Sequence, residues 1–285
     1  MTLASPLRYP GGKGAMTNVL SEIRRRNGVA GLTQAEPFAG GAGASLSLLY
    51  AECAPEILIN DADPAIHDFW WALTENSEDF EDILSRTRAS MAEWRRQRDA
   101  YRNPRTSRLK RGFAAFYLNR CNRSGIIMNG GPIGGTEQTG KWKIGARFNK
   151  EALLSRCRKV GEYAARIKVS GMDGIRFIDS IDTSETFLFI DPPYYHKGPL
   201  LYLNGLDADY HRSLAEKLKS LPENAAWVLT YDDCEEIRDL YGDWAAIRPF
   251  TLMYTASERK RGRETLITPK WMSIPKTQNS LTIEW

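Results

Sequence analysis

The residues with the clearest chemical potential lie in the stretch FLFIDPPYY, residues 187–195. Four apolar residues typical of a buried strand run directly into an acid, two prolines and two tyrosines. Asp191 offers a carboxylate as a hydrogen-bond acceptor. Each proline lacks an N–H and has φ fixed at about −65°, so the turn is stiff and its carbonyl groups are held in place. Tyr194 adds a flat ring, so the stretch supplies an acceptor, a rigid carbonyl and a stacking platform.

A second stretch, EPFAGGAG at residues 36–43, predicts a strand that ends in a glycine-rich turn before a helix. Gly40, Gly41 and Gly43 let the backbone pass close to a ligand at the positive end of that helix. Asp61 stands about 20 residues beyond the turn, the spacing at which a carboxylate meets ribose hydroxyls in nucleoside-binding folds. The turn is not GxGxxG, so a nucleoside without a diphosphate fits better than a dinucleotide. A tight turn without a ligand is the alternative.

The sequence predicts strands that alternate with helices around one interruption. A strand at 32–40, a helix at 42–52 and a short strand at 56–61 come first. Helical spacing extends from 65 to about 117, and a glycine-rich segment at 119–149 predicts loop and hairpin. The alternation then resumes with strands at 166–173 and 187–191, a helix at 209–221, a strand at 225–233, a helix at 234–242 and a strand pair within 247–269. This order indicates an α/β fold with a doubly wound, mostly parallel sheet and a largely helical insertion.

Charge is distributed very unevenly along the chain. Residues 85–150 contain sixteen Lys or Arg and three acids, a net charge of +13. Because the whole chain carries +4, the remainder carries −9. Such asymmetry favours a partner with dense negative charge, and nucleic acid is the first candidate. A solvated arginine-rich helix face is the alternative.

Other features restrict the function classes. The four cysteines have no CxxC spacing and the three histidines form no ligand pair, so we expect neither disulfides nor a bound metal. The first residues lack the apolar core of a secretory signal, and no stretch holds the roughly 18 apolar residues needed to span a bilayer. We therefore expect a soluble, cytoplasmic protein without a membrane partner.

Five stretches in this order, RYPGGK, EPFAGGAG, INDAD, FYLNRCNRSG and FLFIDPPYY, resemble the Dam-like family of DNA adenine methyltransferases, which use S-adenosyl-L-methionine. The resemblance covers nearly the whole chain. It implies a Rossmann-like catalytic domain formed by residues 1–64 and 160–285, and a basic target-recognition insertion at 65–159. In that family the recognition region lies between the donor motif and the catalytic motif, which is where the basic segment lies here.

The resemblance also implies donor-binding residues. They are Tyr9, Lys13, Glu36, Phe38, Gly40, Asp61, Asp173 and Asp191. For Asp173, capping of the next helix fits the sequence equally well. Asp63 does not match the family pattern and is the weaker candidate for ribose binding.

The catalytic residues implied are Asp191, Pro192, Pro193 and Tyr194. The amino nitrogen of adenine is a poor nucleophile because its lone pair is delocalised into the ring. Asp191 and the Pro192 carbonyl would accept the two amino protons, while Tyr194 stacks on a base flipped out of the duplex. No cysteine follows a proline, which argues against methylation at the ring carbon of cytosine. Relatives that methylate the cytosine amine more often carry serine in place of Asp191.

The implied contacts to double-stranded DNA come from two basic regions. They are Asn119, Arg120, Asn122, Arg123, Lys141 and Lys143, and the turn residues Arg259, Lys260 and Arg261. The segment after Asn122 is longer and richer in glycine than in relatives that methylate GATC, so the recognition sequence stays open. The alternatives are methylation of a cytosine amine or of RNA, or a silent DNA-binding module. A cognate restriction endonuclease is a further candidate partner, and a monomer is the expected state.

Overall fold

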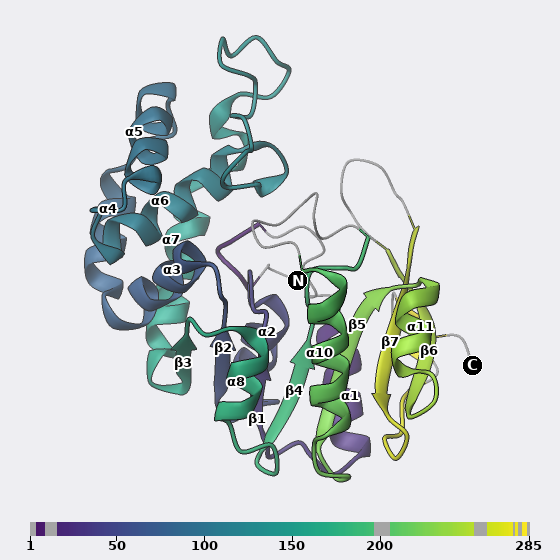
Figure 1. Ribbon diagram of the computed structural model, residues 1–285. Coiled ribbons are helices and arrows are strands. Elements are labelled where there is room, and N and C mark those ends of the chain that lie inside the picture. Colours follow the sequence, from purple (N-terminus) through teal and green to yellow (C-terminus); the bar gives the residue numbers. More distant parts are fainter. Residues whose placement is uncertain are drawn as a thin grey trace. The chain divides into compact units, whose positions relative to one another are not determined.

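The computed structural model describes residues 4–8, 16–196, 206–253, 261–275, 277–278 and 281–283. For residues 252–253, 261–263, 277–278 and 281–283 only the backbone is described. The chain forms two compact units (Figure 1). The first unit comprises Met1–Gly12 and Asp61–Gly171, and the second comprises Lys13–Asn60 and Met172–Trp285. The first unit thus spans 61–171 where the sequence predicts an insertion at 65–159, and it also includes residues 1–12.

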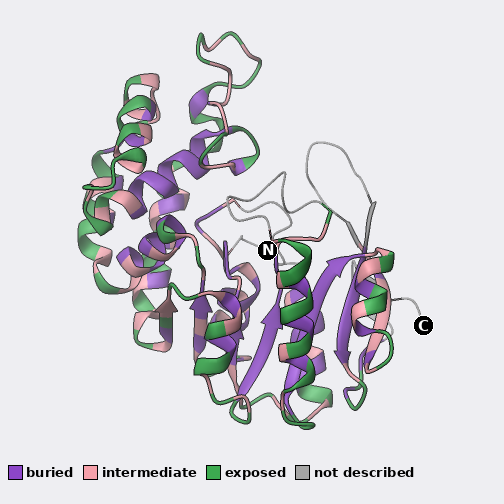
Figure 2. Ribbon diagram, in the orientation of Figure 1, coloured by how far each residue is buried: buried purple, intermediate pink, exposed green. Residues whose placement is uncertain are grey.

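Parallel strands form the central part of the second unit. They are β1 (Thr33–Glu36), β2 (Ile57–Asn60), β4 (Thr186–Ile190) and β5 (Ala226–Asp232). Their order is β2-β1-β4-β5, and every neighbouring pair is parallel. Every residue of β4 and β5 is buried (Figure 2), which explains why their sequences are apolar runs without alternation. The predicted α/β fold is confirmed.

Antiparallel strands continue this sheet beyond β5. They are β6 (Ala245–Met253), β7 (Arg261–Pro269), β8 (Thr277–Gln278) and β9 (Leu281–Ile283), in the order β5-β7-β6-β9-β8. The predicted strand pair within 247–269 is confirmed as β6 and β7. Because β7 lies between β5 and β6, residue Glu264 stands directly opposite Asp232.

Helices of the second unit cover the sheet in two layers. They are α1 (Thr17–Arg26), α2 (Gly43–Tyr50), α8 (Gly174–Ser180), α10 (Ala208–Lys219) and α11 (Glu235–Tyr241). Helix α10 contacts α8 and α11 on one face, and α1 contacts α2 on the other (Figure 1). This is the doubly wound arrangement that the alternating sequence pattern predicts. No helix within the described residues is long and apolar enough to cross a membrane.

The first unit is helical around an aromatic core. Its elements are α3 (Pro64–Glu75), α4 (Ser77–Arg86), α5 (Met91–Arg102), α6 (Arg108–Cys121), α7 (Lys150–Glu162), the 3-10 turns η2 (Arg123–Gly125), η3 (Ile144–Arg147) and η4 (Ala164–Arg166), and β3 (Ile167–Ser170). Phe69, Phe80, Phe113 and Phe116 lie with ring centroids 5.3–5.9 Å apart. All four are almost completely buried, so α3, α4 and α6 are joined by one core.

Helices α3 and α6 also meet through a buried ion pair. The Asp68 carboxylate, 1% exposed, accepts hydrogen bonds from Arg108 Nε at 3.0 Å and Arg111 Nε at 2.6 Å. A buried charge is costly unless it is paired, so both guanidinium groups are needed beside Asp68, although the arginine side chains are 43% and 27% exposed. Part of the basic excess therefore also stabilises the fold.

The glycine-rich segment at 119–149 is a loop and not a hairpin. It contains η2, η3 and one isolated bridge between Asn122 and Pro132, and these residues, all described, form no strand pair. The backbone has positive φ at Gly125, Gly134, Gly135 and Gln138. Turns this frequent leave no room for a regular ladder, so the predicted hairpin is wrong here.

Gly112 tests the packing of α6 on α3. A Cβ at this position would lie 2.5 Å from the backbone carbonyl oxygen of Asp68. Alanine normally stabilises a helix interior by about 1 kcal/mol relative to glycine, but overpacking costs about 1–3 kcal/mol. We therefore expect Gly112→Ala to lower the free energy of unfolding, measured by chemical denaturation.

The matched control is Gly145→Ala, whose Cβ would make an ordinary contact of 3.5 Å with Ala89. It should change the free energy of unfolding by less than about 0.5 kcal/mol. A Gly112→Ala variant as stable as the Gly145→Ala variant would contradict the close approach of the two helices.

Candidate active site

The carboxyl ends of β1, β4 and β5 lie together at one edge of the second unit's sheet. Ala35 pairs with Leu188, so β1 and β4 end within one residue of each other, and Ile190 pairs with Leu229, so β5 runs three residues further, to Asp232. Glu36 and Asp191 stand at these strand ends. Open α/β sheets bind their ligands at this edge, so the sheet brings together two of the predicted site residues there.

Asp191 is oriented by a hydroxyl from the next strand. Thr230, at the end of β5, donates a hydrogen bond from Oγ1 to Asp191 Oδ1 at 2.5 Å. Asp191 is half-buried and Pro192 is buried, so the turn is packed against the sheet. The carboxylate is thereby held at the strand end, where the sequence places it.

Two further acids, which the sequence analysis did not single out, hold the residues after the prolines. Tyr194 donates from its hydroxyl to Glu264 Oε2 at 2.8 Å. The backbone N–H groups of Tyr195 and His196 donate to Asp232 Oδ1 and Oδ2 at 3.1 and 3.2 Å. Asp232 is 6% exposed and Glu264 is 3% exposed. The whole segment from Asp191 to His196 is therefore tied to β5 and β7.

Tyr195, the second tyrosine of the stretch at 187–195, packs in this structure. Its half-buried side chain lies against the hydrophobic core of the second unit. Its ring centroid is 5.0 Å from that of His211, which is buried and contacts Tyr231 Oη through Nδ1 at 2.7 Å. The aromatic layer beneath the catalytic turn thus includes Tyr195.

Glu36 has an unusual electrostatic environment. Its Oε1 accepts hydrogen bonds from Ser45 N at 2.9 Å and Ser45 Oγ at 2.7 Å. Burial raises the pKa of Glu36 from 4.5 to about 7, with a smaller contribution from the charge of Asp191, although the Ser45 hydrogen bonds act in the opposite direction. Glu36 can therefore exist in either protonation state near neutral pH.

The glycine turn after β1 lies where the sequence predicts it, and it contains a left-handed alanine in addition to a left-handed glycine. Gly40 has φ +46° and Ala42, which precedes α2, has φ +45°. The Phe38 ring fills the space above Gly174, where an added Cβ would clash with the ring. Gly40 and Ala42 both have left-handed backbone conformations, so the chain changes direction within one short turn. The first turn of α2 therefore lies next to Glu36, and Ser45 N can donate to its carboxyl group.

Asp173 caps helix α8. Its Oδ1 accepts from the N–H groups of Ile175 and Arg176, and its Oδ2 accepts from the Tyr210 hydroxyl at 2.8 Å. Of the two roles that the sequence allows, the structure supports capping. The donor-binding role of Asp173 is not needed to explain its position.

Asp61 follows the last residue of β2 directly in the chain. Within the first unit, its Oδ1 accepts the N–H of Asp63 at 2.9 Å. Asp63 in turn caps α3 by accepting the N–H of Ala65 at 2.8 Å. This capping role agrees with Asp63 being the weaker candidate for ribose binding.

The predicted DNA contacts of Asn119, Asn122 and Arg120 are corrected by the structure. Asn119 accepts from Arg8 N at 2.7 Å and donates to the carbonyls of Arg8 and Gly125. Asn122 accepts from Trp94 Nε1 at 2.6 Å and donates to the carbonyls of Ile126 and Ile127. Both asparagines are 0% exposed, so their amides hold loops and do not face a partner.

Arg120 is also internal. It is 8% exposed and donates from Nε to the carbonyl of Arg147 at 2.9 Å. Burial, and then the charge of Arg8, lower the pKa of Arg120 to about 10. The polar residues at the end of α6 therefore lie on its buried side, and the sequence does not distinguish this from a binding face.

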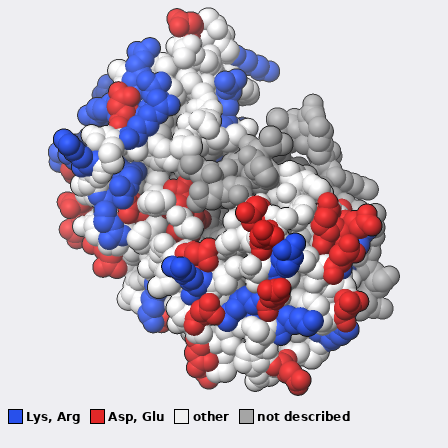
Figure 3. Space-filling view, in the orientation of Figure 1, with Lys and Arg blue, Asp and Glu red and all other residues white. Residues whose placement is uncertain are grey.

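The remaining predicted contacts on this loop lie at the surface. Arg123, Lys141 and Lys143 are exposed, although Lys143 Nζ also donates to the Gln138 carbonyl. Trp142, between the two lysines, is 65% exposed. Figure 3 shows Lys and Arg gathered over the helices of the first unit on the visible face. An exposed tryptophan beside exposed cations suits a nucleic-acid surface.

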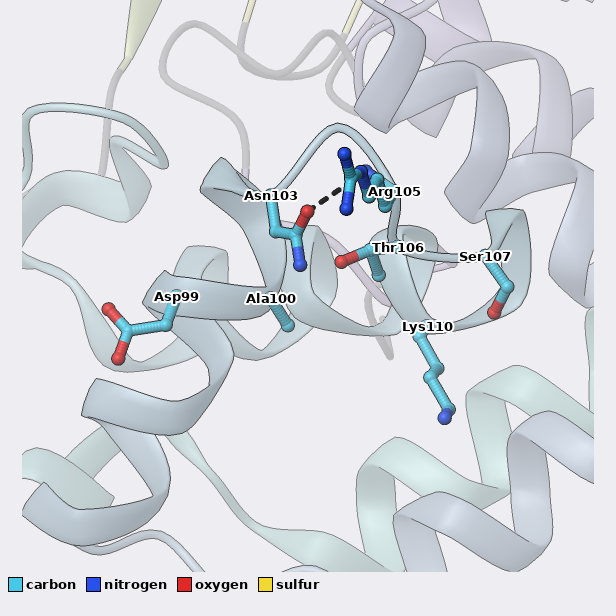
Figure 4. A pocket seen from close by; sticks show the side chains of 7 residues that line it. All are labelled: Asp99, Ala100, Asn103, Arg105, Thr106, Ser107 and Lys110. Atoms are coloured by element: carbon cyan, nitrogen blue, oxygen red, sulfur yellow. Dashed lines mark hydrogen bonds between the residues drawn. The ribbon is translucent and has the colours of Figure 1, made fainter.

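A pocket between α5 and α6 adds further cationic groups (Figure 4). It is lined by Asp99, Ala100, Asn103, Arg105, Thr106, Ser107 and Lys110. Asn103 Oδ1 accepts the backbone N–H of Arg105 at 2.9 Å, which shapes the turn between the helices. Hydroxyl, amide and cationic groups around one hollow are the groups that phosphate oxygens accept from.

Among the described residues, one group of side chains has the composition of a metal site. His196, Cys234 and Glu236 bring possible ligand atoms within 4.8 Å of one another. His196 Nε2 lies 3.3 Å from Glu236 Oε2, and both side chains are largely exposed. A surface His–Glu pair accounts for this arrangement.

Other predicted residues lie outside the described ranges. They are Tyr9, Lys13, Arg259 and Lys260, and only the backbone of Arg261 is described. Their assignments stay predictions from the sequence.

Comparison with known proteins identifies the family. The family described as D12 class N6 adenine-specific DNA methyltransferase matches residues 9–258. The chain belongs to this family. The resemblance to Dam-like adenine methyltransferases is confirmed, and the chain is an adenine-specific DNA methyltransferase. Comparison with curated proteins found no match.

Among solved structures, the chain is similar to the rRNA methyltransferase aviRa from Streptomyces viridochromogenes, with 16% identity and a TM-score of 0.40. The match covers 92% of this chain and 86% of that chain. The matched family range includes both the glycine turn and the catalytic turn of this methyltransferase. The site residues that sequence reasoning missed are Ser45, Thr230, Asp232 and Glu264. The sequence could have indicated Thr230 and Asp232, because polar residues at the end of a buried apolar strand break the local pattern and such departures often mark functional sites.

Glu36 makes the stability of this methyltransferase depend on pH. When the pKa of an acid is raised on folding, the protein loses unfolding free energy as pH rises above the pKa of the acid in the unfolded chain. The loss is complete above its pKa in the folded protein. The window here runs from 4.5 to about 7. A glutamine at this position does not titrate, and its side-chain oxygen can still accept from Ser45. Between pH 5 and pH 8, Glu36→Gln should therefore gain about 2–3 kcal/mol in unfolding free energy relative to the wild type.

The comparison variant is Ser45→Ala, which removes the hydroxyl that lowers the Glu36 pKa. It should move the fall in stability to higher pH. Denaturation curves at several pH values measure both effects. A constant difference between Glu36→Gln and wild type across this range would contradict the assignment.

Proposed function

We propose that this enzyme transfers a methyl group from S-adenosyl-L-methionine to the exocyclic N6 amine of an adenine flipped out of duplex DNA. The observation that carries the proposal is the turn Asp191–Tyr194 at the carboxyl end of β4, with its acid oriented by Thr230, in a chain of the D12 family. The family accounts for adenine and DNA. The turn accounts for the chemistry at the amine.

The amine needs two acceptors. Its lone pair is delocalised into the ring, so both protons must be drawn into hydrogen bonds before the nitrogen can become pyramidal and attack. We assign one proton to the Asp191 carboxylate and the other to the Pro192 carbonyl. Pro192 is buried and both prolines have restricted φ, so the carbonyl is preset. Placement of this kind supports transfer because in-line attack depends on orientation.

Tyr194 is the platform for the base. Its ring is half-buried, and its hydroxyl is bound to Glu264. Stacking of a base on an aromatic ring contributes about 1–3 kcal/mol. This gain offsets part of the few kcal/mol needed to unstack and unpair the target base.

The methyl donor fits the edge beside β1. S-adenosyl-L-methionine, when bound, supplies an electrophilic methyl group on a positively charged sulfur. The turn at 40–42 with two left-handed residues allows close approach of a ligand, and the carboxyl group of the buried acid Glu36 lies beside it. We assign the ribose hydroxyls to Asp61 from its place directly after β2, at the spacing seen in nucleoside-binding folds. Phe38 and Gly40 complete the donor wall on the second unit.

The transfer balances without a further reactant. A bond forms between N6 and the methyl carbon while the carbon–sulfur bond breaks, and the electron pair stays on sulfur. The nitrogen then loses one proton toward Asp191. The products are N6-methyladenine in DNA and S-adenosylhomocysteine.

We propose that the first unit binds the DNA backbone through the loop at 123–143 and the pocket between α5 and α6. Arg123 and Lys141 are exposed on the loop, and Arg105 and Lys110 line the pocket. Trp142 is placed to stack on a base or sugar. One chain carries both acceptors and the platform, which supports action as a monomer. A sequence-specific adenine mark would suit a cognate endonuclease.

Replacement of the acceptor tests the proposed chemistry. Asp191→Asn keeps the size of the side chain but removes the charge and half of the acceptor capacity. We expect the single-turnover rate of methyl transfer to fall by about 10³-fold or more, with binding of duplex DNA nearly unchanged. The measurement uses labelled donor, duplex DNA and digestion to nucleosides.

The control is Asp239→Asn, an exposed acid on α11, which should methylate at the wild-type rate. Label in N6-methyladenine supports the proposal. Label in methylcytosine, or an Asp191→Asn variant with more than about a tenth of the wild-type rate, would sink it.

The salt dependence of DNA binding tests the proposed surface. Each phosphate contact contributes about one unit to the slope of log K against log salt concentration. Arg123→Ala and Lys141→Ala should each weaken binding and reduce that slope by about 1. Lys219→Ala, an exposed cation on α10 of the second unit, should leave the slope unchanged. Equal slopes for all three variants would exclude the loop as a phosphate contact.

A further inference from the structure

Two buried acids stand opposite each other on β5 and β7 and accept hydrogen bonds from the catalytic segment. Asp232 and Glu264 are direct cross-strand partners, 6% and 3% exposed. Like-charged partners at directly opposite positions are unfavourable, and burial adds to this cost. A fold that keeps both acids at this place has donors that compensate them, and these donors come from residues 194–196.

Asp232 fixes the path of the chain after the platform tyrosine. Its two carboxylate oxygens accept the successive backbone N–H groups of Tyr195 at 3.1 Å and His196 at 3.2 Å. A backbone has no side-chain freedom, so this double contact sets the direction in which the chain leaves Tyr194. It also satisfies both of these N–H donors.

Glu264 fixes the far end of the same tyrosine. The Tyr194 hydroxyl donates to Glu264 Oε2 at 2.8 Å, while the other end of the side chain is set by the stiff Pro192–Pro193 turn. Rotation about the Cα–Cβ bond would carry the hydroxyl away from Glu264, so this hydrogen bond holds the side chain in one rotamer. The position of the ring is therefore set before a base arrives.

We propose that Asp232 and Glu264 are positioning residues that preset the place of the Tyr194 ring at the catalytic turn, so that the extruded adenine stacks with its amine directed at Asp191. This inference rests on the proposed function. It assigns a task to two acids that do not touch the reacting atoms. Thr230 serves the acceptor in the same way, because it orients Asp191 from the neighbouring strand.

Presetting matters because the reaction depends on alignment. A misplacement of about 1 Å can cost 10²-fold in rate even when it arises away from the reacting atoms. A ring free to rotate would still bind the base, but it would hold the amine at a wider range of angles. Loss of either acid should therefore lower the rate of transfer more than the affinity for DNA.

A double-mutant cycle between Tyr194 and Glu264 tests the inference. If Glu264 acts through the tyrosine hydroxyl, Glu264→Ala and Tyr194→Phe should each lower the single-turnover rate by about tenfold or more. The double variant should be no slower than the worse single variant. Glu264→Gln, which keeps an acceptor oxygen, should recover most of the lost rate.

A fluorescence measurement separates positioning from general loss of structure. Duplex DNA with 2-aminopurine at the target position reports stacking of the flipped base, because its emission depends on the ring that it contacts. Glu264→Ala and Asp232→Asn should bind this DNA within about twofold of the wild-type affinity but give a different emission, since the stack is loosened. Binding also measures the folded, competent fraction of each variant.

The matched control is Glu235→Gln, an exposed acid at the start of α11, which should equal the wild type in rate and emission. Additive losses in the cycle, or an unchanged emission for Glu264→Ala, overturn the positioning role while leaving the methyltransferase assignment intact. Absence of N6-methyladenine from the wild-type reaction overturns the proposed function, and the inference with it.

Discussion

Acids that are buried or half-buried at one edge of the sheet are the constraint on which the second unit depends. Each acid there accepts hydrogen bonds from another segment of the unit: Glu36 from Ser45, Asp191 from Thr230, and Asp232 and Glu264 from the segment Tyr194–His196. An acid left without its donor would be buried at a cost of several kcal/mol. The glycine turn, the catalytic turn and strands β5 and β7 are therefore mutually dependent. Burial at this edge also raises the pKa of Glu36, so the charge of the site depends on pH.

In the first unit, several polar side chains of the types that bind nucleic acid instead form hydrogen bonds and ion pairs within the unit. Asn119 and Asn122 each place an amide where several backbone groups would otherwise lack partners. Arg108 and Arg111 neutralise Asp68 between two helices. Exposed cations remain on the loop around Trp142, on α5 and on the turn between α5 and α6. Because Arg120 is buried, the surface charge is smaller than the composition of the segment indicates.

The fold and the catalytic turn can be predicted because their signals are local. Runs of apolar residues ending in an acid specify buried parallel strands, and Asp191 lies at a strand end as expected. The pairing of Asp232 with Glu264 cannot be predicted, because it depends on β7 lying between β5 and β6. The family resemblance implies that Asn119 and Asn122 contact DNA, and the sequence alone does not correct this, because burial of a polar side chain cannot be seen in a single sequence. The sequence also predicts a hairpin in the glycine-rich loop, because glycine residues indicate turns but do not show how many turns form or whether strands lie between them.

The chain passes between the two units three times, after Gly12, after Asn60 and after Gly171. Residues 4–8 belong with the first unit partly because the Asn119 side chain bonds the backbone of Arg8. Its Oδ1 accepts the Arg8 N–H and its Nδ2 donates to the Arg8 carbonyl, the pair of bonds that a neighbouring strand would make. The first unit is therefore not a cassette that recombination could exchange through residues 61–171 alone. An exchanged unit would have to bring its own residues 4–8, so these residues and residues 61–171 are expected to evolve together.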